Sequence, residues 1–547
     1  MDESDDEVKA PAKGAKPLAP AAEKKVQAKK PDSDEDGPGD GVAGVWCSDA
    51  TGHKPTVRDY KFTKAECGYI GPDLPPVVTP WVVFALFCNI AFIDLMVNST
   101  NDFGAHGEGR AARWTPMSKT EFLVFIGIII LMGVVKMPSY KDYWDPTLCV
   151  FAVSFAEKMS VTRFGLIQSH LHCAPQGVDD SVDKCAKVRG VLNHLQQLCG
   201  CLWRPLQHLS YDEMMIKCKS AWARICVRMP MKPIKWGIKV FGVCCSATGW
   251  ILNFWVYGGL PAPDCGLNIG LTGNQIHLVC RAWAFLGYTL YMDNYFSNRA
   301  LFQALHHLGF NCVGTARKNR VPATMQLKKS KKSKGIINHC VSTSNPPVHA
   351  WTMMDRGVVT IMSTMHKVGD MSTITRRSGA AKEELTAPTA LAEYNMYMGG
   401  CDMADQLRAS YRAQRMRQMR WYMCLFYWAL DVMVACSYII YNSFDRAPTM
   451  THKSFRVQLA MYLIRGNDGD IAPPKAPKRM RIEETLPAFR LNPGTHFPVE
   501  TDLRRNCVMC FRRTPSVASG TKIQCSTCQK PLHIACWMDW HNDPNAK

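Results

Sequence analysis

Residues 288–298 read YTLYMDNYFSN, a run of strand-forming residues that ends at an aspartate. Tyr288 to Met292 are aromatic, β-branched or apolar, which is typical of a buried strand. Asp293 follows at the carboxyl end of this predicted strand, and polar residues that favour a turn come next. Asp293 could therefore cap the following helix or hold a metal ion.

The segments around this stretch predict a sheet with a defined strand order. Before it, residues 209–218 predict one strand, and residues 235–259 predict two strands joined by a turn at residues 246–249. After it, residues 298–308 predict a helix and residues 310–317 a fifth strand. Three consecutive strands followed by strand, helix and strand is the order of a ribonuclease-H-like α/β fold, in which the first and fourth strands are neighbours.

Composition divides the chain of 547 residues into several segments. Acidic clusters and Lys-, Pro- and Ala-rich stretches predict disorder near the start, and apolar residues at helical spacing predict flanking helices. The predicted segments are a disordered N-terminal region (1–75), the first part of a mostly helical domain (76–205), the first part of the α/β domain (206–316), an insertion domain (317–388), the closing helix of the α/β domain (389–411), the second part of the helical domain (412–470), a basic linker (471–500) and a Cys-rich finger (501–547).

The net charge of +19 favours a polyanionic partner, and nucleic acid fits better than an acidic membrane surface. The first forty residues lack the apolar core of an export signal, so we expect the 24 cysteines to be reduced or bound to metal. The longest apolar run, Phe122 to Val135, is 14 residues, and a bilayer span needs about 20. We therefore expect a buried helix there and no membrane segment.

Two carboxylates are predicted to meet at one edge of the sheet. Asp212 lies on the first strand, and Asp293 ends the neighbouring fourth strand. A third carboxylate is expected from the closing helix, where Asp402 and Asp405 share one face because they are three positions apart. Carboxylate oxygens hold Mg²⁺ or Mn²⁺, and two such ions about 4 Å apart catalyse phosphodiester displacement. The pattern predicts a two-metal site.

Each of these carboxylates also has a simpler explanation. Asp212 could be a surface strand residue, and Glu213 beside it makes the choice of carboxylate ambiguous. Asp293 could belong to a turn and cap. Asp402 could cap its helix, with Asp405 interacting with the helix dipole in the first turn.

Basic residues cluster near these carboxylates. Residues 232–239 interleave lysines with Trp236, and Trp222 precedes them, which suits phosphate contact and base stacking as well as burial of the rings. An Arg-rich run after Asp405 suits the DNA backbone, the alternative being a solvated helix face. The residues predicted to contact DNA are Lys232, Lys235, Lys239, Arg412, Arg415, Arg417 and Arg420.

Two further basic stretches are open to two interpretations each. Residues 328–335, KKSKKSKG, could be a DNA-contacting loop or a solvated one. Residues 474–482, PKAPKRMRI, are typical of a nuclear import signal, although an ordinary charged linker has the same composition.

The tail contains the pattern C-x2-C-x14-C-x2-C-x4-H-x2-C-x4-H. Pairs at this spacing bind Zn²⁺, and their alternation predicts an interleaved cross-brace. Asp543 and His496 are candidates for the eighth ligand, although a ribbon with a single zinc ion would need none. One predicted site consists of Cys507, Cys510, His533 and Cys536, and the other of Cys525, Cys528, His541 and the eighth ligand.

Four motifs, taken in order, resemble those of the piggyBac family of DNA transposases. They are SYDEMMIKC (210–218), KPIKWGIKVF (232–241), YMDNYFSN (291–298) and MYMGGCDMADQ (396–406). The resemblance covers roughly residues 80–465 and the Cys-rich tail. Asn298 stands where the family often has Ser, and Cys401 where Val is common, and neither change removes a ligand.

The resemblance implies that Asp212, Asp293 and Asp402 are catalytic and that Asp405 is a further metal-site aspartate. It implies hydrolysis at transposon 3′ ends, hairpin formation by attack of each 3′-OH, and joining at TTAA targets, in a nuclear enzyme that uses Mg²⁺ or Mn²⁺. We expect a homodimer that holds two DNA ends, with a zinc finger that binds the transposon end.

Three functional hypotheses follow. The first is an active transposase, and the second is a transposon-derived DNA- or chromatin-binding protein without catalysis, in which Trp537 and Trp540 of the finger could form aromatic walls for a protein ligand. The third is a ribonuclease-H-like nuclease with another substrate. The intact aspartates favour the first hypothesis over the second, and the tail and the motif set disfavour the third.

Overall fold

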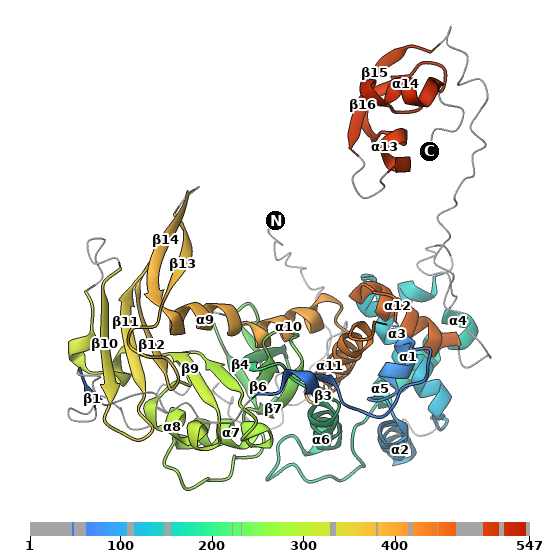
Figure 1. Ribbon diagram of the computed structural model, residues 1–547. Coiled ribbons are helices and arrows are strands. Elements are labelled where there is room, and N and C mark those ends of the chain that lie inside the picture. Colours follow the sequence, from blue (N-terminus) through green and yellow to red (C-terminus); the bar gives the residue numbers. More distant parts are fainter. Residues whose placement is uncertain are drawn as a thin grey trace, which may run out of the picture. The chain divides into compact units, whose positions relative to one another are not determined.

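The computed structural model of the chain forms two compact units, residues 1–467 and residues 468–547 (Figure 1). Each unit is described by itself. The described residues are 46–48, 62–106, 114–145, 147, 155–220, 223–230, 232–328, 335–378, 381–413, 420–445, 447–465, 496–513 and 519–542.

The centre of the first unit is a mixed β-sheet with the predicted strand order. It contains β4 (His208–Lys217), β6 (Trp236–Cys245), β7 (Ile251–Val256), β8 (Thr289–Met292) and β9 (Asn311–Thr315). β4, β6 and β7 form an antiparallel meander, while β8 pairs parallel with both β4 and β9. The ribonuclease-H-like order is therefore confirmed, and the first and fourth strands are neighbours.

Helices cover both faces of this sheet (Figure 1). α7 (Gly270–Cys280) and α8 (Arg299–His307) lie on one face, and α9 (Thr389–Tyr397) and α10 (Gly400–Ser410) on the opposite face. Asn298 caps α8 by accepting a hydrogen bond from the Leu301 amide at 2.8 Å. The short β5 (Cys226–Arg228) and α7 have no counterpart in the sequence prediction.

The predicted insertion continues the sheet. β12 (Val358–Ser363) pairs antiparallel with β9, and β11 (His349–Met354) and β10 (Ile337–Ser342) follow in order. Among the described residues of the insertion, only the hairpin of β13 (Met371–Ser378) and β14 (Ala381–Pro388) forms a separate ladder. Ten strands thus share one sheet.

The expectation of disorder throughout residues 1–75 is wrong for two short segments. β1 (Trp46–Cys47) pairs with β10 and buries the indole of Trp46, and β2 (Gly68–Tyr69) pairs with β3 (Trp203–Arg204). Each segment is ordered by backbone pairing with a strand distant in sequence, which composition cannot reveal. Residues 1–45 and 49–61 lie outside the described residues.

The predicted helices on either side of the α/β core are present in the first unit. The N-terminal set is α1 (Pro80–Phe84), α2 (Ile90–His106), α3 (Lys119–Val134), α4 (Phe155–Lys158), α5 (Val161–His170) and α6 (Ala186–Cys201), and the C-terminal set is α11 (Met423–Asn442) and α12 (His452–Arg465). α3 packs against α12 so closely that a Cβ on Gly127 would lie 2.9 Å from the Ala460 carbonyl oxygen.

The apolar run at residues 122–135 forms most of the buried helix α3. Within the described part of the chain, α11 alone is long and apolar enough to cross a membrane, and 89% of its most apolar window is buried against the rest of the protein. α11 is therefore placed as a core helix that contacts α1, α6 and α12.

The second unit is small and built around one hairpin. β15 (Pro498–Asn506) pairs antiparallel with β16 (Gly520–Cys525), and the helices α13 (Val508–Arg513) and α14 (Ile534–Asn542) pack against each other. Its core consists mainly of cysteines together with Met509, Leu532 and Trp540. A core with so few apolar side chains is too small to stabilise the unit by itself, so we expect an additional source of stability.

A buried ion pair joins the two C-terminal helices to the segment that follows α10. Arg456 of α12 is fully buried and donates hydrogen bonds to Asp431 of α11 (3.1 Å) and to the Tyr411 carbonyl (2.6 Å). Asp431 also accepts from the Ala413 amide at 3.0 Å. The pair therefore fixes the position at which α10 leaves the sheet.

We predict that Arg456→Met destabilises the first unit by about 3–5 kcal/mol, because it leaves the Asp431 carboxylate buried without its cation. Replacing both residues, as in Asp431→Leu with Arg456→Met, should recover part of this loss. Urea unfolding followed by tryptophan fluorescence measures both effects.

The control is Lys119→Met, which removes the exposed pair between Lys119 and Asp94. It should cost less than about 1 kcal/mol. Equal losses for the Arg456 and Lys119 variants would contradict a structural role for the buried pair.

Candidate metal centres

Strand register brings Asp212 and Asp293 together. In the parallel ladder of β4 and β8 the last paired residues are Tyr211 and Met292. Asp212 and Asp293 are the next residues along the chain, so they are neighbours where the parallel ladder ends, although β4 itself continues to Lys217 in its pairing with β6. They lie in one row of the sheet and on one face of it, because side chains alternate faces along a strand.

Glu213 completes this acidic group. One carboxylate oxygen from each of Asp212, Glu213 and Asp293 lies within 4.8 Å of the others, and all three residues are half-buried. The Glu213 amide donates a hydrogen bond to Asp212 Oδ1 at 2.7 Å, so the Asp212 carboxylate lies against the backbone of the next residue. Sequence reasoning left the choice between Asp212 and Glu213 open, and the structure places both in the group.

Asp293 is a turn residue as well as a member of the acidic group. Its Oδ1 accepts a hydrogen bond from the Tyr295 amide at 2.8 Å. It does not cap α8, because Asn298 occupies that position. The turn therefore binds one oxygen of the Asp293 carboxylate, and this hydrogen bond fixes the orientation of that carboxylate.

The electrostatics of the acidic group favour a bound cation. Burial, followed by the charge of Glu213 and a hydrogen bond with it, raises the pKa of Asp212 to about 8. Burial also raises the pKa of Asp293. Burial acts in the same direction on Glu213, but hydrogen bonds with Asp212 and Lys232 lower its pKa overall. Carboxylates held this close repel one another, and a divalent cation would relieve the repulsion.

α10 approaches the sheet closely enough to bring Asp402 near this group. A Cβ on Gly400 would lie 2.5 Å from Ser210 Oγ, and the Cys401 amide donates to the same oxygen at 3.0 Å. Asp402 is exposed in the first turn of α10, and its charge contributes to a raised pKa of Lys232. Its oxygens lie outside the 4.8 Å group.

Asp405 is placed differently from Asp402. Its Oδ1 accepts a hydrogen bond from the buried Arg408 at 2.9 Å, and the two form an ion pair one helical turn apart. Asp405 also lies outside the acidic group. Its carboxylate thus already has a cationic partner.

Of the three predicted DNA-contacting lysines, only Lys235 is exposed. Lys232 forms an ion pair with Glu213 at 2.9 Å, beside the acidic group. Lys239 is only 8% exposed, and its ammonium lies 5.1–5.2 Å from the centres of three aromatic rings, those of Phe241, Tyr257 and Tyr295. Lys239 is therefore a buried cation–π residue and is not presented to a DNA backbone.

The arginines predicted to contact DNA also differ in their surroundings. Arg420 donates to the carbonyls of Leu171 (2.6 Å) and Gln168 (3.0 Å), so its guanidinium serves the helical packing. Arg412 is half-buried. The described part of the chain does not include Arg415, Arg417 or Trp222, nor most of the stretches 328–335 and 471–500.

The second unit contains one cluster of metal-ligating side chains at the start of α13 and α14. Its members are Cys507, Cys510, His533 and Cys536, and one ligand atom of each lies within 4.8 Å of all the others. Cys510 Sγ lies 3.4 Å from His533 Nδ1 and 3.7 Å from Cys536 Sγ. The His533 amide points at Cys507 Sγ from 3.4 Å.

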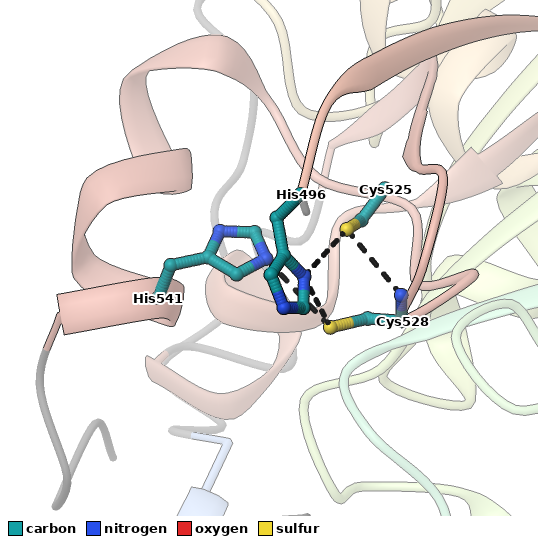
Figure 2. Close-up of side chains that lie close together, drawn as sticks. All are labelled: His496, Cys525, Cys528 and His541. Atoms are coloured by element: carbon teal, nitrogen blue, oxygen red, sulfur yellow. Dashed lines mark hydrogen bonds between the residues drawn. The ribbon is translucent and has the colours of Figure 1, made fainter. Parts of the chain in front are cut away.

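Figure 2 shows the other cluster, formed by His496, Cys525, Cys528 and His541. His496 Nδ1 lies 3.1 Å from Cys525 Sγ and 3.2 Å from Cys528 Sγ, and His541 Nε2 lies 3.7 Å from Cys528 Sγ. All four residues are buried. His496 thus occupies the place of the missing eighth ligand, while Asp543 lies outside the described residues.

These distances fit tetrahedral zinc. Bonds of about 2.3 Å to sulfur and about 2.0 Å to nitrogen hold ligand atoms roughly 3.3–3.8 Å apart. His541 Nδ1 lies 2.9 Å from the Trp537 carbonyl, so its proton is held there and the Nε2 lone pair faces the cluster. The same logic applies to His533, whose Nε2 lies 3.3 Å from Ser519 Oγ. The two clusters alternate along the chain as a cross-brace.

Sequence reasoning named His496 but could not choose between it and Asp543. The deciding signal is chemical, because structural zinc sites take nitrogen and sulfur ligands far more often than carboxylates. The suggested aromatic walls do not form, since Trp540 is fully buried in the core of the unit.

Comparisons with known proteins agree with this architecture. The family model described as Transposase IS4 matches residues 79–438. The chain is 25% identical to PiggyBac transposable element-derived protein 3 of Homo sapiens over 526 residues, covering 89% of this chain and 83% of that protein. It is 24% identical to PiggyBac transposable element-derived protein 2 of Homo sapiens, covering 85% of this chain and 76% of that protein.

Among solved structures, the chain is similar to a piggyBac transposase, determined by cryo-EM as a synaptic complex with hairpin DNA. The TM-score is 0.61 at 20% identity, and the match covers 83% of this chain and 95% of that chain. This likeness shows the fold. Because the family model spans well over half of the sequence, the chain belongs to the piggyBac-type family of transposases.

Proposed function

We propose that this chain is a metal-dependent DNA transposase whose active site is formed by Asp212, Asp293 and Asp402. The observation that carries the proposal is the convergence of the Asp212, Glu213 and Asp293 carboxylates where the parallel ladder of β4 and β8 ends, with α10 packed beside them. Clustered, half-buried carboxylates are costly without a cation, so a purely structural role is a poor explanation for them.

The roles of the residues follow from their positions. Asp212 and Asp293 would hold divalent cations from the sheet, and Asp402 would close the site from the exposed first turn of α10. When bound, two Mg²⁺ or Mn²⁺ ions would activate the attacking oxygen and stabilise the leaving oxygen of a phosphodiester. Lys232 offsets the excess charge of Glu213. Asp405, already paired with Arg408, would orient α10.

One site of this kind can serve several steps with different nucleophiles. We propose hydrolysis at the transposon 3′ ends, attack of each 3′-OH on the opposite strand to form hairpins, and joining to TTAA targets. The similar solved structure is named as a synaptic complex with hairpin DNA, which supports the hairpin stage of this proposal. Of the residues predicted to contact DNA, we propose the exposed Lys235 and the half-buried Arg412 for backbone contact. We also propose a nuclear homodimer that holds two ends.

The second unit would act as a zinc-stabilised DNA-binding module. Two clusters of four Cys and His ligands fit two Zn²⁺ ions, which would supply the stability that its small apolar core lacks. We propose that it recognises the transposon end.

A second candidate function is DNA or chromatin binding without transposition. It is supported by the names of the two human relatives, which describe them as derived from transposable elements. Flanking inverted repeats and TTAA at the genomic copy would favour an active transposase, and a single copy spliced into a host gene would favour the second function.

The first test is strand cleavage of a labelled duplex with the terminal repeat of the coding element and a TTAA flank. We predict that Asp293→Asn slows cleavage in Mg²⁺ by about 100- to 1,000-fold, because it removes a charged metal ligand. Asp94→Asn, which alters an exposed carboxylate in the helical part, is the matched control and should cut at the wild-type rate. Tight binding without cleavage by the wild type would favour the second function.

The geometry also predicts an order of importance for metal binding to the free protein. Asp293→Asn should weaken Mn²⁺ binding about tenfold or more, whereas Asp402→Asn should have a smaller effect because Asp402 lies outside the acidic group. Titration followed by Mn²⁺ electron paramagnetic resonance measures the affinities. Asp405→Asn is the control, since Arg408 already pairs with that carboxylate. Equal losses at all three positions would contradict this assignment.

For the second unit, we predict two zinc ions per chain by elemental analysis. His496→Ala should reduce this to about one, because the remaining three ligands of its cluster leave zinc weakly held. Asp543→Ala should retain both ions. A loss of zinc in the Asp543 variant, but not in the His496 variant, would reverse the choice of ligand.

A further inference from the structure

A pair of hydroxyl groups lies beside the acidic group. In the parallel ladder of β8 and β9 the last paired residues are Met292 and Gly314. Thr315 is therefore the neighbour of Asp293 on the far side from Asp212, so Asp212, Asp293 and Thr315 form one row across three parallel strands. Residues in one row point to the same face, which is the face that carries α9 and α10.

Tyr394 reaches this row from α9. Thr315 Oγ1 donates a hydrogen bond to the Tyr394 hydroxyl at 3.4 Å. The Tyr394 ring packs against the apolar cluster under α9, which includes Val313 and Leu391. The Tyr394 ring is therefore held by apolar packing, and its hydroxyl oxygen is oriented by the hydrogen bond from Thr315.

The Tyr394 hydroxyl faces negative charge and keeps its proton. Burial, with a smaller contribution from the charges of Asp293, Asp212 and Asp402, raises its pKa to about 12. It is therefore a neutral hydrogen-bond donor at physiological pH. Within the described part of the chain its oxygen accepts from Thr315, and no side chain there takes its proton.

Such a donor is what an anionic substrate would need here. The acidic group repels a phosphate, and the nearby Lys232 is already paired with Glu213. A neutral phenol is a poor ligand for Mg²⁺, which prefers carboxylates and water, but it is a good partner for a phosphate oxygen.

We propose that the Tyr394 hydroxyl, oriented by Thr315, donates a hydrogen bond to a non-bridging oxygen of the phosphate that is cut. Tyr394 is then a catalytic residue and Thr315 a positioning residue. The inference rests on the proposed transposase function. It adds a substrate contact made by a neutral side chain, besides those that metal ions and lysines would make.

The test compares Tyr394→Phe with Tyr397→Phe, the same change one turn further along α9. Phe keeps the ring in both variants, and Tyr397 stacks on His208, away from the acidic group. Each is assayed under single turnover on the labelled terminal-repeat duplex in Mg²⁺, together with Mn²⁺ affinity, duplex affinity and thermal stability. The substrate is also made with sulfur in place of either non-bridging oxygen of the scissile phosphate.

We expect Tyr394→Phe to slow cleavage about 100-fold, the lower end of the cost of removing one donor to a transition-state oxygen, with Mn²⁺ affinity and stability unchanged. Tyr397→Phe should stay within about twofold of the wild type. The penalty of Tyr394→Phe should shrink for one of the two sulfur-substituted substrates, because sulfur accepts hydrogen bonds poorly. Thr315→Val should slow cleavage less than Tyr394→Phe, and Thr315→Ser should restore the rate.

Two outcomes would overturn the inference while leaving the proposed function intact. The first is a Tyr394→Phe variant that cuts at the wild-type rate. The second is a Tyr394→Phe variant that loses Mn²⁺ affinity along with its cleavage rate, which would place the hydroxyl in the metal site. If the wild type cuts none of these duplexes, the proposed function fails and the Tyr394 contact fails with it.

Discussion

The parallel pairing of β4 with β8 is the constraint on which the rest of the first unit depends. It is the contact that turns two aspartates distant in sequence into neighbours, and it sets the sheet face on which α9 and α10 must pack to come near them. Parallel strands need a crossover, and the chain supplies it by passing through β6, β7 and α7. Between β9 and α9 the chain adds three further strands to the same sheet, and α9 and α10 then pack on the face that carries the two aspartates.

The close packing of α10 on the sheet depends on the absence of a side chain at Gly400. A Cβ there would clash with Ser210 Oγ, and the same oxygen accepts a hydrogen bond from the Cys401 amide. Beyond α10 the chain is held by the buried pair of Asp431 and Arg456, through the carbonyl of Tyr411 and the amide of Ala413. The helical part and the α/β part are therefore linked by polar contacts that act on both ends of α10.

Strand order could be predicted from the sequence because each strand and turn is a local pattern, and the neighbours Asp212 and Asp293 followed from it. The continuation of the sheet through the insertion could not be predicted, since it depends on which distant edge β12 meets. Charge alone also could not reveal the surroundings of Lys239 and Arg420, whose cationic groups lie against aromatic rings and backbone carbonyls. Glu213 stayed ambiguous because it follows Asp212 directly on β4, and alternation along a strand gives no reason to expect both carboxylates in one group.

The small strand β1 has a consequence for solubility. An open sheet edge exposes unpaired backbone groups that invite another chain to add a strand. β1 pairs with Val341 and Ser342 of β10, and so shields part of the outermost long strand. A short segment near the start of the chain, in a region whose composition predicts disorder, thus covers the sheet edge. A truncation that removes Trp46 and Cys47 would leave nine strands and expose the β10 edge to pairing with another chain.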